Sequence, residues 1–283
     1  MQATLKKYFP IFVLPTLIAF AIAFLVPFVI GFFLSFTDFT TITNAQWVGI
    51  ENYQKAFSER EGFVASFGFT LMVVVVSIIT VNLFAFWIAW ILTRKLKGTN
   101  FFRTVFFMPN LIGGIVLGYT WQSMINAVLA SYGTTIVSDW KFGYAGLIIL
   151  INWQLVGYMM IIYIAGLQNV PVDLVEAARI DGATSSQILF KIKIPMVMPS
   201  VTICTFLTLT NSFKLFDQNL SLTAGEPAKQ SMMLAYNIYD TFYARSGPQW
   251  KGIGQAKAVL FCILVIAISS LQLKLTKSKE VQQ

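Results

Sequence analysis

The chain has 283 residues, of which 57% are hydrophobic and only 11% are charged, and its mean hydropathy is +0.71. A soluble domain of this length cannot bury so much apolar surface, so these values predict a membrane protein. The chain has no histidine, which excludes His-based nucleophilic catalysis and nearly every histidine metal site. The formal net charge is +8, but no basic run is long enough to follow a nucleic-acid backbone.

Uncharged runs along the chain predict the membrane spans, because a spanning helix needs about 20 apolar residues. The first run follows Lys6 and Lys7 but is too long for a signal peptide, and no small-residue cleavage site follows promptly, so we expect an uncleaved span. The third run ends at a turn near Ser131-Tyr132-Gly133. The two cysteines, Cys204 and Cys262, lie inside apolar runs and are expected as free thiols. The expected fold is all-α and integral to the membrane, one domain over residues 1–283 with six transmembrane helices at about 10–36, 67–93, 104–126, 144–168, 195–217 and 254–273.

The distribution of basic residues predicts the orientation of these spans, because cytoplasmic segments carry an excess of Lys and Arg. If both termini are cytoplasmic, the outer loops hold six basic residues: Lys55, Arg60, Lys141, Lys229, Arg245 and Lys251. The cytoplasmic segments then hold twelve: Lys6, Lys7, Arg94, Lys95, Lys97, Arg103, Arg179, Lys191, Lys193, Lys274, Lys277 and Lys279. This twofold bias agrees with an even number of spans. It places the loop 169–194, between the fourth and fifth spans, in the cytoplasm.

The first half of this loop has the features of a short helix. Pro171 suits a first helical turn, and Asp173 and Glu176 place carboxylates near the positive end of the helix dipole. Ala177 and Ala178 favour helix and leave a thin surface that a partner protein can approach closely.

The second half predicts a stop and a second helix. Asp181-Gly182 is a natural helix end, since glycine accepts positive φ. Thr184 and Gln187 then have the spacing of a capping box. Local physics leaves two interpretations open, a rigid knob that docks on a partner protein or a solvated connector.

The residues Glu176-Ala177-Ala178, Gly182, Ile192 and Ile194-Pro195 stand at the spacing of the EAA motif, and here the chain resembles the permeases of binding-protein-dependent ABC importers. The one departure is Ile194, where leucine is usual. The likeness covers most of the chain and points to the maltose-type carbohydrate permeases through segments 12–15, 34–38, 49–53, 153–168, 170–171, 216–217 and 222–227. The last of these segments is similar to the first of the two paired permeases, although the family more often has glycine at 224 and 226.

This resemblance implies a coupling helix that docks on a cytosolic ATPase and moves with it, and its carried-over positions are Glu176, Ala177, Ala178, Asp181 and Gly182. It also implies a second permease subunit in a heterodimer, two ATPase subunits and an extracytoplasmic solute-binding protein. The sequence contains no Gly-x-x-x-x-Gly-Lys-Ser/Thr, so ATP and Mg are expected on the partner ATPase and no cofactor in this chain. The expected location is a bacterial or archaeal plasma membrane, crossed several times.

Polar side chains within the spans are candidates for a carbohydrate pathway, because transporter sites tend to lie near the middle of the bilayer. Gln154 and Tyr158 lie four residues apart in the fourth span. Thr208, Asn211 and Ser212 share one helix face in the fifth span. Interhelical hydrogen bonding is the alternative role of such residues. The expected substrate is an oligosaccharide or a related polar solute such as a glycerophosphate.

Two other classes of protein are disfavoured by the residues in the spans. A secondary transporter needs ion-coupling carboxylates inside its spans, and only Asp217, at a span end, comes close. A membrane-embedded enzyme is disfavoured by the lack of histidine and of clustered carboxylates at span depth. Lys214, near the outer end of the fifth span, is expected to reach the membrane surface or to pair with Asp217.

Overall fold

The structure is a computed structural model that describes residues 2–94 and 97–278, with the backbone alone at 2–8 and 10. Two of the basic residues predicted to be cytoplasmic, Lys95 and Lys279, lie outside the described residues. The described chain divides into two compact units. The first unit, called here the hairpin unit, comprises residues 1–63 and 238–262, and the second, the core unit, comprises 64–237 and 263–283. The prediction of a single domain therefore stays a prediction.

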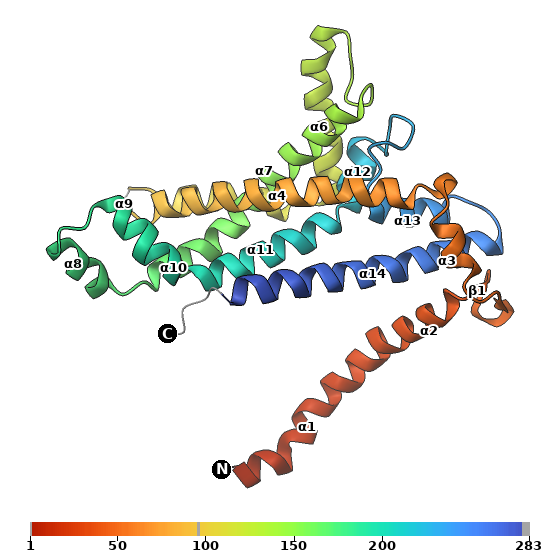
Figure 1. Ribbon diagram of the computed structural model, residues 1–283, viewed down its shortest axis with the longest axis horizontal. Helices are drawn as coiled ribbons and strands as arrows, with labels where there is room; N and C mark the ends of the chain where they lie inside the picture. Colours follow the sequence, from red (N-terminus) through yellow and green to blue (C-terminus); the bar gives the residue numbers. More distant parts are fainter. Residues whose placement is uncertain (1, 95–96, 279–283) are drawn as a thin grey trace. The chain divides into compact units, whose positions relative to one another are not determined.

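The described residues form helices almost throughout, as Figure 1 shows. The two short strands, β1 (Thr37–Asp38) and β2 (Gln46–Trp47), pair antiparallel in the hairpin unit. Short 3-10 helices cover Ile42–Asn44, Glu59–Glu61, Met108–Leu111 and Ala130–Tyr132, and π-helices cover Ala21–Leu25 and Leu189–Lys193. The α-helices are α1 (Gln2–Phe20), α2 (Val26–Leu34), α3 (Glu51–Ala56), α4 (Phe63–Leu92), α5 (Thr99–Phe107), α6 (Gly114–Leu129), α7 (Trp140–Gln168), α8 (Val172–Ile180), α9 (Ser185–Ile188), α10 (Ile194–Met196), α11 (Met198–Phe213), α12 (Phe216–Leu222), α13 (Leu234–Tyr243) and α14 (Pro248–Lys277).

Four helical segments of the described chain are long and apolar enough to cross a membrane: Ile11–Leu34, Phe63–Leu92, Trp140–Gln168 and Pro248–Lys277. They match the first, second, fourth and sixth predicted spans. The third and fifth spans were expected as single helices over 104–126 and 195–217, but each is a bent pair of helices. If each pair is one span, the described chain holds up to six.

The two bends have local causes. Between α5 and α6 the chain turns by 101°, where Pro109 lies in the 3-10 helix and Gly113 is extended with ψ of 140°. Proline removes a backbone donor, and an extended residue ends the helical ladder. Between α10 and α11 the turn is 66°. Pro195 lies in the first turn of α10, which precedes the bend, and Pro199 lies in the first turn of α11, which follows it. The turn expected near Ser131-Tyr132-Gly133 is present, since Gly133 has φ of +68°.

Small residues let the helices of the core unit approach closely. A Cβ atom at Gly118 of α6 would overlap the Ser221 side chain of α12, and one at Gly114 would come within 2.8 Å of Asp217 Cβ. A Cβ at Gly157 of α7 would overlap the backbone carbonyl of Phe106 in α5. These contacts seat α12 against α6 and α5 against α7, and α11 also packs on α7.

In the hairpin unit a buried polar cluster joins segments that are distant in the sequence. The Lys257 ammonium of α14 lies 3.0 Å from a Glu61 carboxylate oxygen and donates to Thr241 Oγ1 at 2.8 Å. The other Glu61 oxygen accepts from Arg245 at 2.8 Å. The sequence did not predict this ion pair, because Glu61 and Lys257 lie 196 positions apart.

Candidate functional site: the loop between α7 and α11

The loop that follows α7 opens with a short helix, as expected. Pro171 is the N-cap of α8, one position earlier than the first-turn position predicted for it, with φ of −57° and ψ of 130°. Asp173 lies in the first turn, and Arg179 in the last turn complements the negative end of the helix dipole.

The end of α8 is closed by a left-handed glycine. Gly182 has φ of +79°, and its N–H donates to the Arg179 carbonyl at 3.1 Å. The N–H of Ala183 reaches back to the Ala178 carbonyl at 2.9 Å. This pair of bonds is the Schellman arrangement, which satisfies carbonyls that the helix end leaves open. The predicted helix stop at Asp181-Gly182 is therefore confirmed.

The second helix begins with the predicted capping box. The Thr184 hydroxyl accepts from the Gln187 N–H at 3.3 Å, and the Gln187 side chain accepts from the Thr184 N–H at 2.8 Å. Beyond this box the chain turns inward, since Ile188 and Leu189 are buried. The loop is thus a helix–glycine–helix unit anchored at its far end in the core unit.

The outward surface of α8 carries the residues that the EAA motif singles out. Glu176, Ala177, Asp181 and Gly182 are exposed, and Ala178 is half-buried. The sequence did not single out Ile180, whose side chain is 86% exposed. Val172 and Leu174 of the same helix are also exposed, so α8 presents several uncovered apolar side chains rather than one isolated residue. The signal was available, because Ile180 stands between the charged residues Arg179 and Asp181.

The polar candidates on α7 contact neighbouring helices of the core unit. Gln154 accepts a hydrogen bond from Gln218 of α12 at 2.9 Å. Tyr158 is half-buried, and its ring centroid lies 6.4 Å from that of Phe107. Gln154 thus links two helices, which is the role that interhelical hydrogen bonding gives to such residues.

The candidates on α11 differ in exposure. Thr208 and Ser212 are fully buried, and Asn211 is half-buried, with its amide donating to the Leu207 carbonyl at 2.8 Å. Among the described residues the Ser212 hydroxyl has no hydrogen-bond partner. The shared helix face is real, but only Asn211 has a partly open side chain.

Asn82 of α4 is a polar hub that the sequence analysis did not name. It accepts from the Tyr163 hydroxyl at 2.8 Å and donates to Thr208 Oγ1 at 3.4 Å, which ties α4, α7 and α11 together. A second amide, Asn152 of α7, donates to Thr80 of α4 at 2.9 Å. Isolated amides in uncharged runs were the signal for both. Thr208 is thus a partner of this network.

The described part of the chain contains no group of three or more His, Cys, Asp or Glu residues placed to hold a metal ion. Both cysteines are free, with Cys204 buried and Cys262 half-buried. The groups that the site offers are hydrogen-bonding amides and hydroxyls between helices, and an exposed capped helix outside them. This arrangement suits recognition and movement.

Long apolar helices joined by a capped helix–glycine–helix loop define the class of multi-pass membrane proteins. The chain belongs to the family described as the binding-protein-dependent transport system inner membrane component, which matches residues 82–279. The resemblance drawn from the EAA motif is thereby confirmed.

Two relatives carry names that state a role. The chain is 39% identical to the probable starch degradation products transport system permease protein AmyD of Thermoanaerobacterium thermosulfurigenes, over 96% of this chain and 94% of that protein. It is 32% identical to the multiple sugar-binding transport system permease protein MsmF of Streptococcus mutans serotype c, over 88% of each chain. Both relatives are transport permeases.

A solved structure has the same fold. A chain of a bacterial ABC transporter involved in the import of the acidic polysaccharide alginate superposes with a TM-score of 0.79 at 19% identity, over 98% of each chain. At this identity the match supports the fold alone.

Proposed function

We propose that this chain is one permease subunit of an ATP-driven importer that moves an oligosaccharide into the cytoplasm. The observation that carries the proposal is the capped α8–Gly182–α9 loop with the EAA spacing, in a member of the binding-protein-dependent permease family. The names of the relatives, which refer to starch degradation products and to multiple sugars, support a carbohydrate as the cargo.

The proposed complex contains a second, different permease subunit, two ATPase subunits and an extracytoplasmic solute-binding protein. The family description supports dependence on a binding protein. The alginate transporter has also been solved with a periplasmic protein bound to alginate pentasaccharide. ATP and Mg bind to the ATPase subunits in this proposal, and this chain holds no cofactor, consistent with a sequence that lacks a phosphate-binding loop.

The proposed topology has six spans with both termini in the cytoplasm of a bacterium or an archaeon. The twofold excess of basic residues in the segments assigned to the cytoplasm supports this orientation. The α8 helix then faces the compartment that holds the ATPase.

Glu176, Ala177, Ala178, Asp181 and Gly182 form the ATPase-docking surface in this mechanism. Closure of the ATPase dimer on ATP pulls α8, and the anchored residues Ile188 and Leu189 transmit the movement to the helices of the core unit. The permease pair then switches from inward-open to outward-open and receives sugar from the binding protein. Rigid capping matters here, because a frayed loop would absorb the displacement.

Gln154, Tyr158, Thr208, Asn211 and Ser212 remain the proposed substrate-pathway residues. Amide and hydroxyl groups with an aromatic ring suit a sugar, and Asn211 and Tyr158 are the partly open members of the set. The two stripes lie on α7 and α11, helices that pack on one another.

The assignment of the class is tested by transport with the reconstituted complex across a panel of labelled oligosaccharides. We expect ATP-dependent uptake of at least one oligosaccharide and none without the binding protein. Uptake that proceeds without any ATPase subunit, driven by an ion gradient, would overturn the proposal.

The docking surface is tested with Glu176→Lys. We expect this variant to insert in the membrane normally but to lose the ATPase on purification, because the charge of an exposed contact residue is reversed. Glu51→Lys is the matched control, since Glu51 is also exposed but lies in the hairpin unit and pairs with exposed Lys55. If Glu176→Lys still copurifies with its ATPase and transports normally, the docking assignment is wrong.

A further inference from the structure

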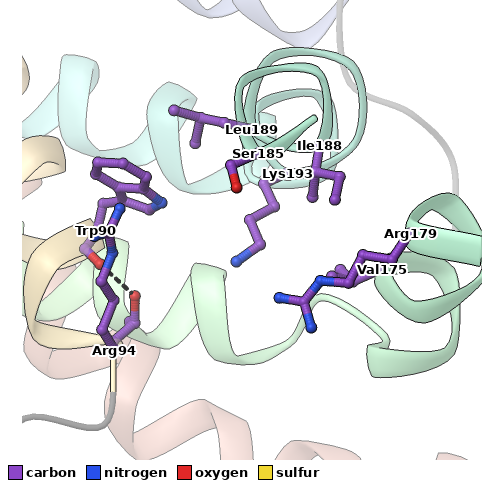
Figure 2. Close-up of a pocket in the computed structure, with 9 residues that line it drawn as sticks. Trp90, Arg94, Val175, Arg179, Ser185, Ile188, Leu189 and Lys193 are labelled. Carbon is purple, nitrogen blue, oxygen red and sulfur yellow. Dashed lines mark hydrogen bonds between the residues drawn. The ribbon is translucent and has the colours of Figure 1, made fainter. Parts of the chain in front are cut away.

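A pocket of about 440 Å³ opens beside the coupling loop in the core unit, between the end of α4, α8 and the segment formed by α9 and the following π-helix (Figure 2). Its volume falls in the range of small-ligand sites. Three cationic residues from three different segments of the chain line the pocket. Arg94 follows α4, Arg179 is on α8, and Lys193 ends the π-helix Leu189–Lys193.

The three cations line this space without a carboxylate beside them in the wall: none of the described residues that line the pocket is Asp or Glu. Among the ion pairs of residues 2–94 and 97–278, none includes Arg94, Arg179 or Lys193. Figure 2 shows Lys193 and Arg179 pointing into the same open space, with Arg94 across from them. Like charges around one cavity repel, and an anion between them relieves that repulsion.

The pocket also has an apolar and aromatic side. The Arg94 guanidinium lies 4.0 Å from the centroid of the Trp90 ring, and the buried Ile188 and Leu189 form part of the wall. The uncharged run of α4 ends at Leu92, so Trp90 and Arg94 stand where a candidate span ends. Tryptophan followed by a basic residue at a span end is typical of the level of the lipid headgroups.

We propose that this pocket binds the phosphate group of an anionic membrane phospholipid. The phosphate would be held by Arg94, Arg179 and Lys193, and the glyceryl and upper acyl part would lie against Trp90 and the apolar wall. Basic pockets at span ends are known places for phospholipid headgroups. A headgroup held in this way ties the end of α4 to α8, so lipid charge would affect how firmly the coupling helix is held. The inference does not depend on which sugar is carried.

The test uses the full importer complex in nanodiscs of phosphatidylcholine with increasing phosphatidylglycerol, and counts retained lipid by native mass spectrometry. We expect wild type to retain phosphatidylglycerol selectively. Lys193→Gln should lower this retention about fivefold, the effect of one basic residue near an anionic headgroup. Lys191→Gln is the matched control, because Lys191 is exposed on the same π-helix but does not line the pocket. Arg94→Gln is a second variant, for use if Lys193→Gln does not assemble.

Further measurements separate the sources of the anion. Copurification of the ATPase is recorded for each variant, so failure of docking is distinguished from loss of lipid. Inorganic phosphate is added to wild type in pure phosphatidylcholine and, separately, in the presence of phosphatidylglycerol. If phosphate saturates the pocket and displaces phosphatidylglycerol, the pocket binds a soluble phosphate and the assignment to a lipid is overturned. Equal retention of both lipids by wild type would overturn the proposal. Loss of ATPase by Lys193→Gln with unchanged lipid would also overturn it, and would make the pocket a receptor for an ATPase carboxylate.

Discussion

The Nζ atom of Lys257 lies 3.0 Å from Oε2 of Glu61, and these two side chains are 0% and 4% exposed. A buried charge is costly unless an opposite charge and hydrogen bonds compensate it. Here Thr241 and the Glu61 carbonyl accept from the same ammonium, at 2.8 and 3.2 Å. Arg245 shares the carboxylate and stacks at 4.5 Å over the Trp250 ring. The cluster ties α14 to the segment before α4 within the hairpin unit.

Breaking this pair should destabilise the hairpin unit. Glu61→Gln removes the carboxylate that lies 3.0 Å from the buried Lys257 ammonium, and breaking a buried ion pair typically costs about 3–5 kcal/mol. We expect a clear drop in the Tm of the purified complex in nanodiscs, followed by intrinsic fluorescence. The double variant Glu61→Gln with Lys257→Met should be more stable than Glu61→Gln alone, because the buried ammonium is removed together with its nearest carboxylate.

The matched control for that series is the ion pair between Lys55 and Glu51, which is 2.7 Å long but exposed at both ends. Exposed pairs contribute less than about 1 kcal/mol. Lys55→Gln should therefore leave the Tm nearly unchanged. An equal drop in Tm for the exposed and the buried pair would show that burial of Glu61 and Lys257 is not what matters.

The stability that Glu61 contributes should depend on pH. Burial of Glu61 raises its pKa, but hydrogen bonds and charges from Arg245 and Lys257 outweigh burial and hold the pKa below its ordinary value of 4.5. A lowered pKa means that the carboxylate stabilises the folded protein fully above that value and loses this effect as the pH falls toward the folded-state pKa. The difference in Tm between wild type and Glu61→Gln should be constant near neutral pH and shrink below about pH 4.5. A difference that grows on acidification would contradict this sign.

Local signals predicted the coupling loop well. The positive φ of Gly182 and the capping box of Thr184 and Gln187 are decided by residues within a few positions of one another. Side-chain caps and glycine preferences act at that range, so a single sequence carries them. The spacing of Gly114 and Gly118, four residues apart, is likewise a local signal that is typical of close helix packing, although it does not identify the partner helix.

Long-range relationships escaped the sequence. Glu61 and Lys257 are 196 positions apart, and Asn82 meets Thr208 across 126. Composition locates each residue in a span or in a loop but gives no information on which segments become neighbours. The bends in the third and fifth spans also escaped, since length and apolar content cannot distinguish one straight helix from two helices joined near Pro109, or from two joined between Pro195 and Pro199. Their prolines were visible, but the angle depends on packing.

The conformation of Gly182 should matter for coupling more than the space around it. No heavy atom outside its chain neighbours would lie within 4 Å of a Cβ there, and its φ is +79°. A residue other than glycine is destabilised by about 1–2 kcal/mol in the left-handed region, and valine has no side-chain hydrogen bond to offset this strain. Gly182→Val should therefore loosen the α8 end and lower ATP-driven uptake, while Gly182→Asn, which tolerates this conformation, should retain most of it. Equal loss in both variants would indicate a contact role for the glycine.

Gly157 allows α7 to approach α5, and its replacement should separate the two helices. An ideal Cβ there would overlap the Phe106 carbonyl and come within 2.8 Å of the Phe107 backbone nitrogen. Backbone atoms cannot move aside as a flexible side chain can. Gly157→Ala should therefore lower the free energy of unfolding by about 1–3 kcal/mol, the usual effect of overpacking.

Gly68→Ala is the control for Gly157→Ala, because Gly68 also lies within a long helix but a Cβ there meets nothing within 4 Å. Alanine at an open helical position is favoured over glycine by up to about 1 kcal/mol. The two substitutions therefore have opposite predicted signs, with the Tm of the purified complex lowered by Gly157→Ala and unchanged or raised by Gly68→Ala. If Gly157→Ala leaves the Tm and the yield of assembled complex at the wild-type level, α5 does not pack on α7 as closely as described.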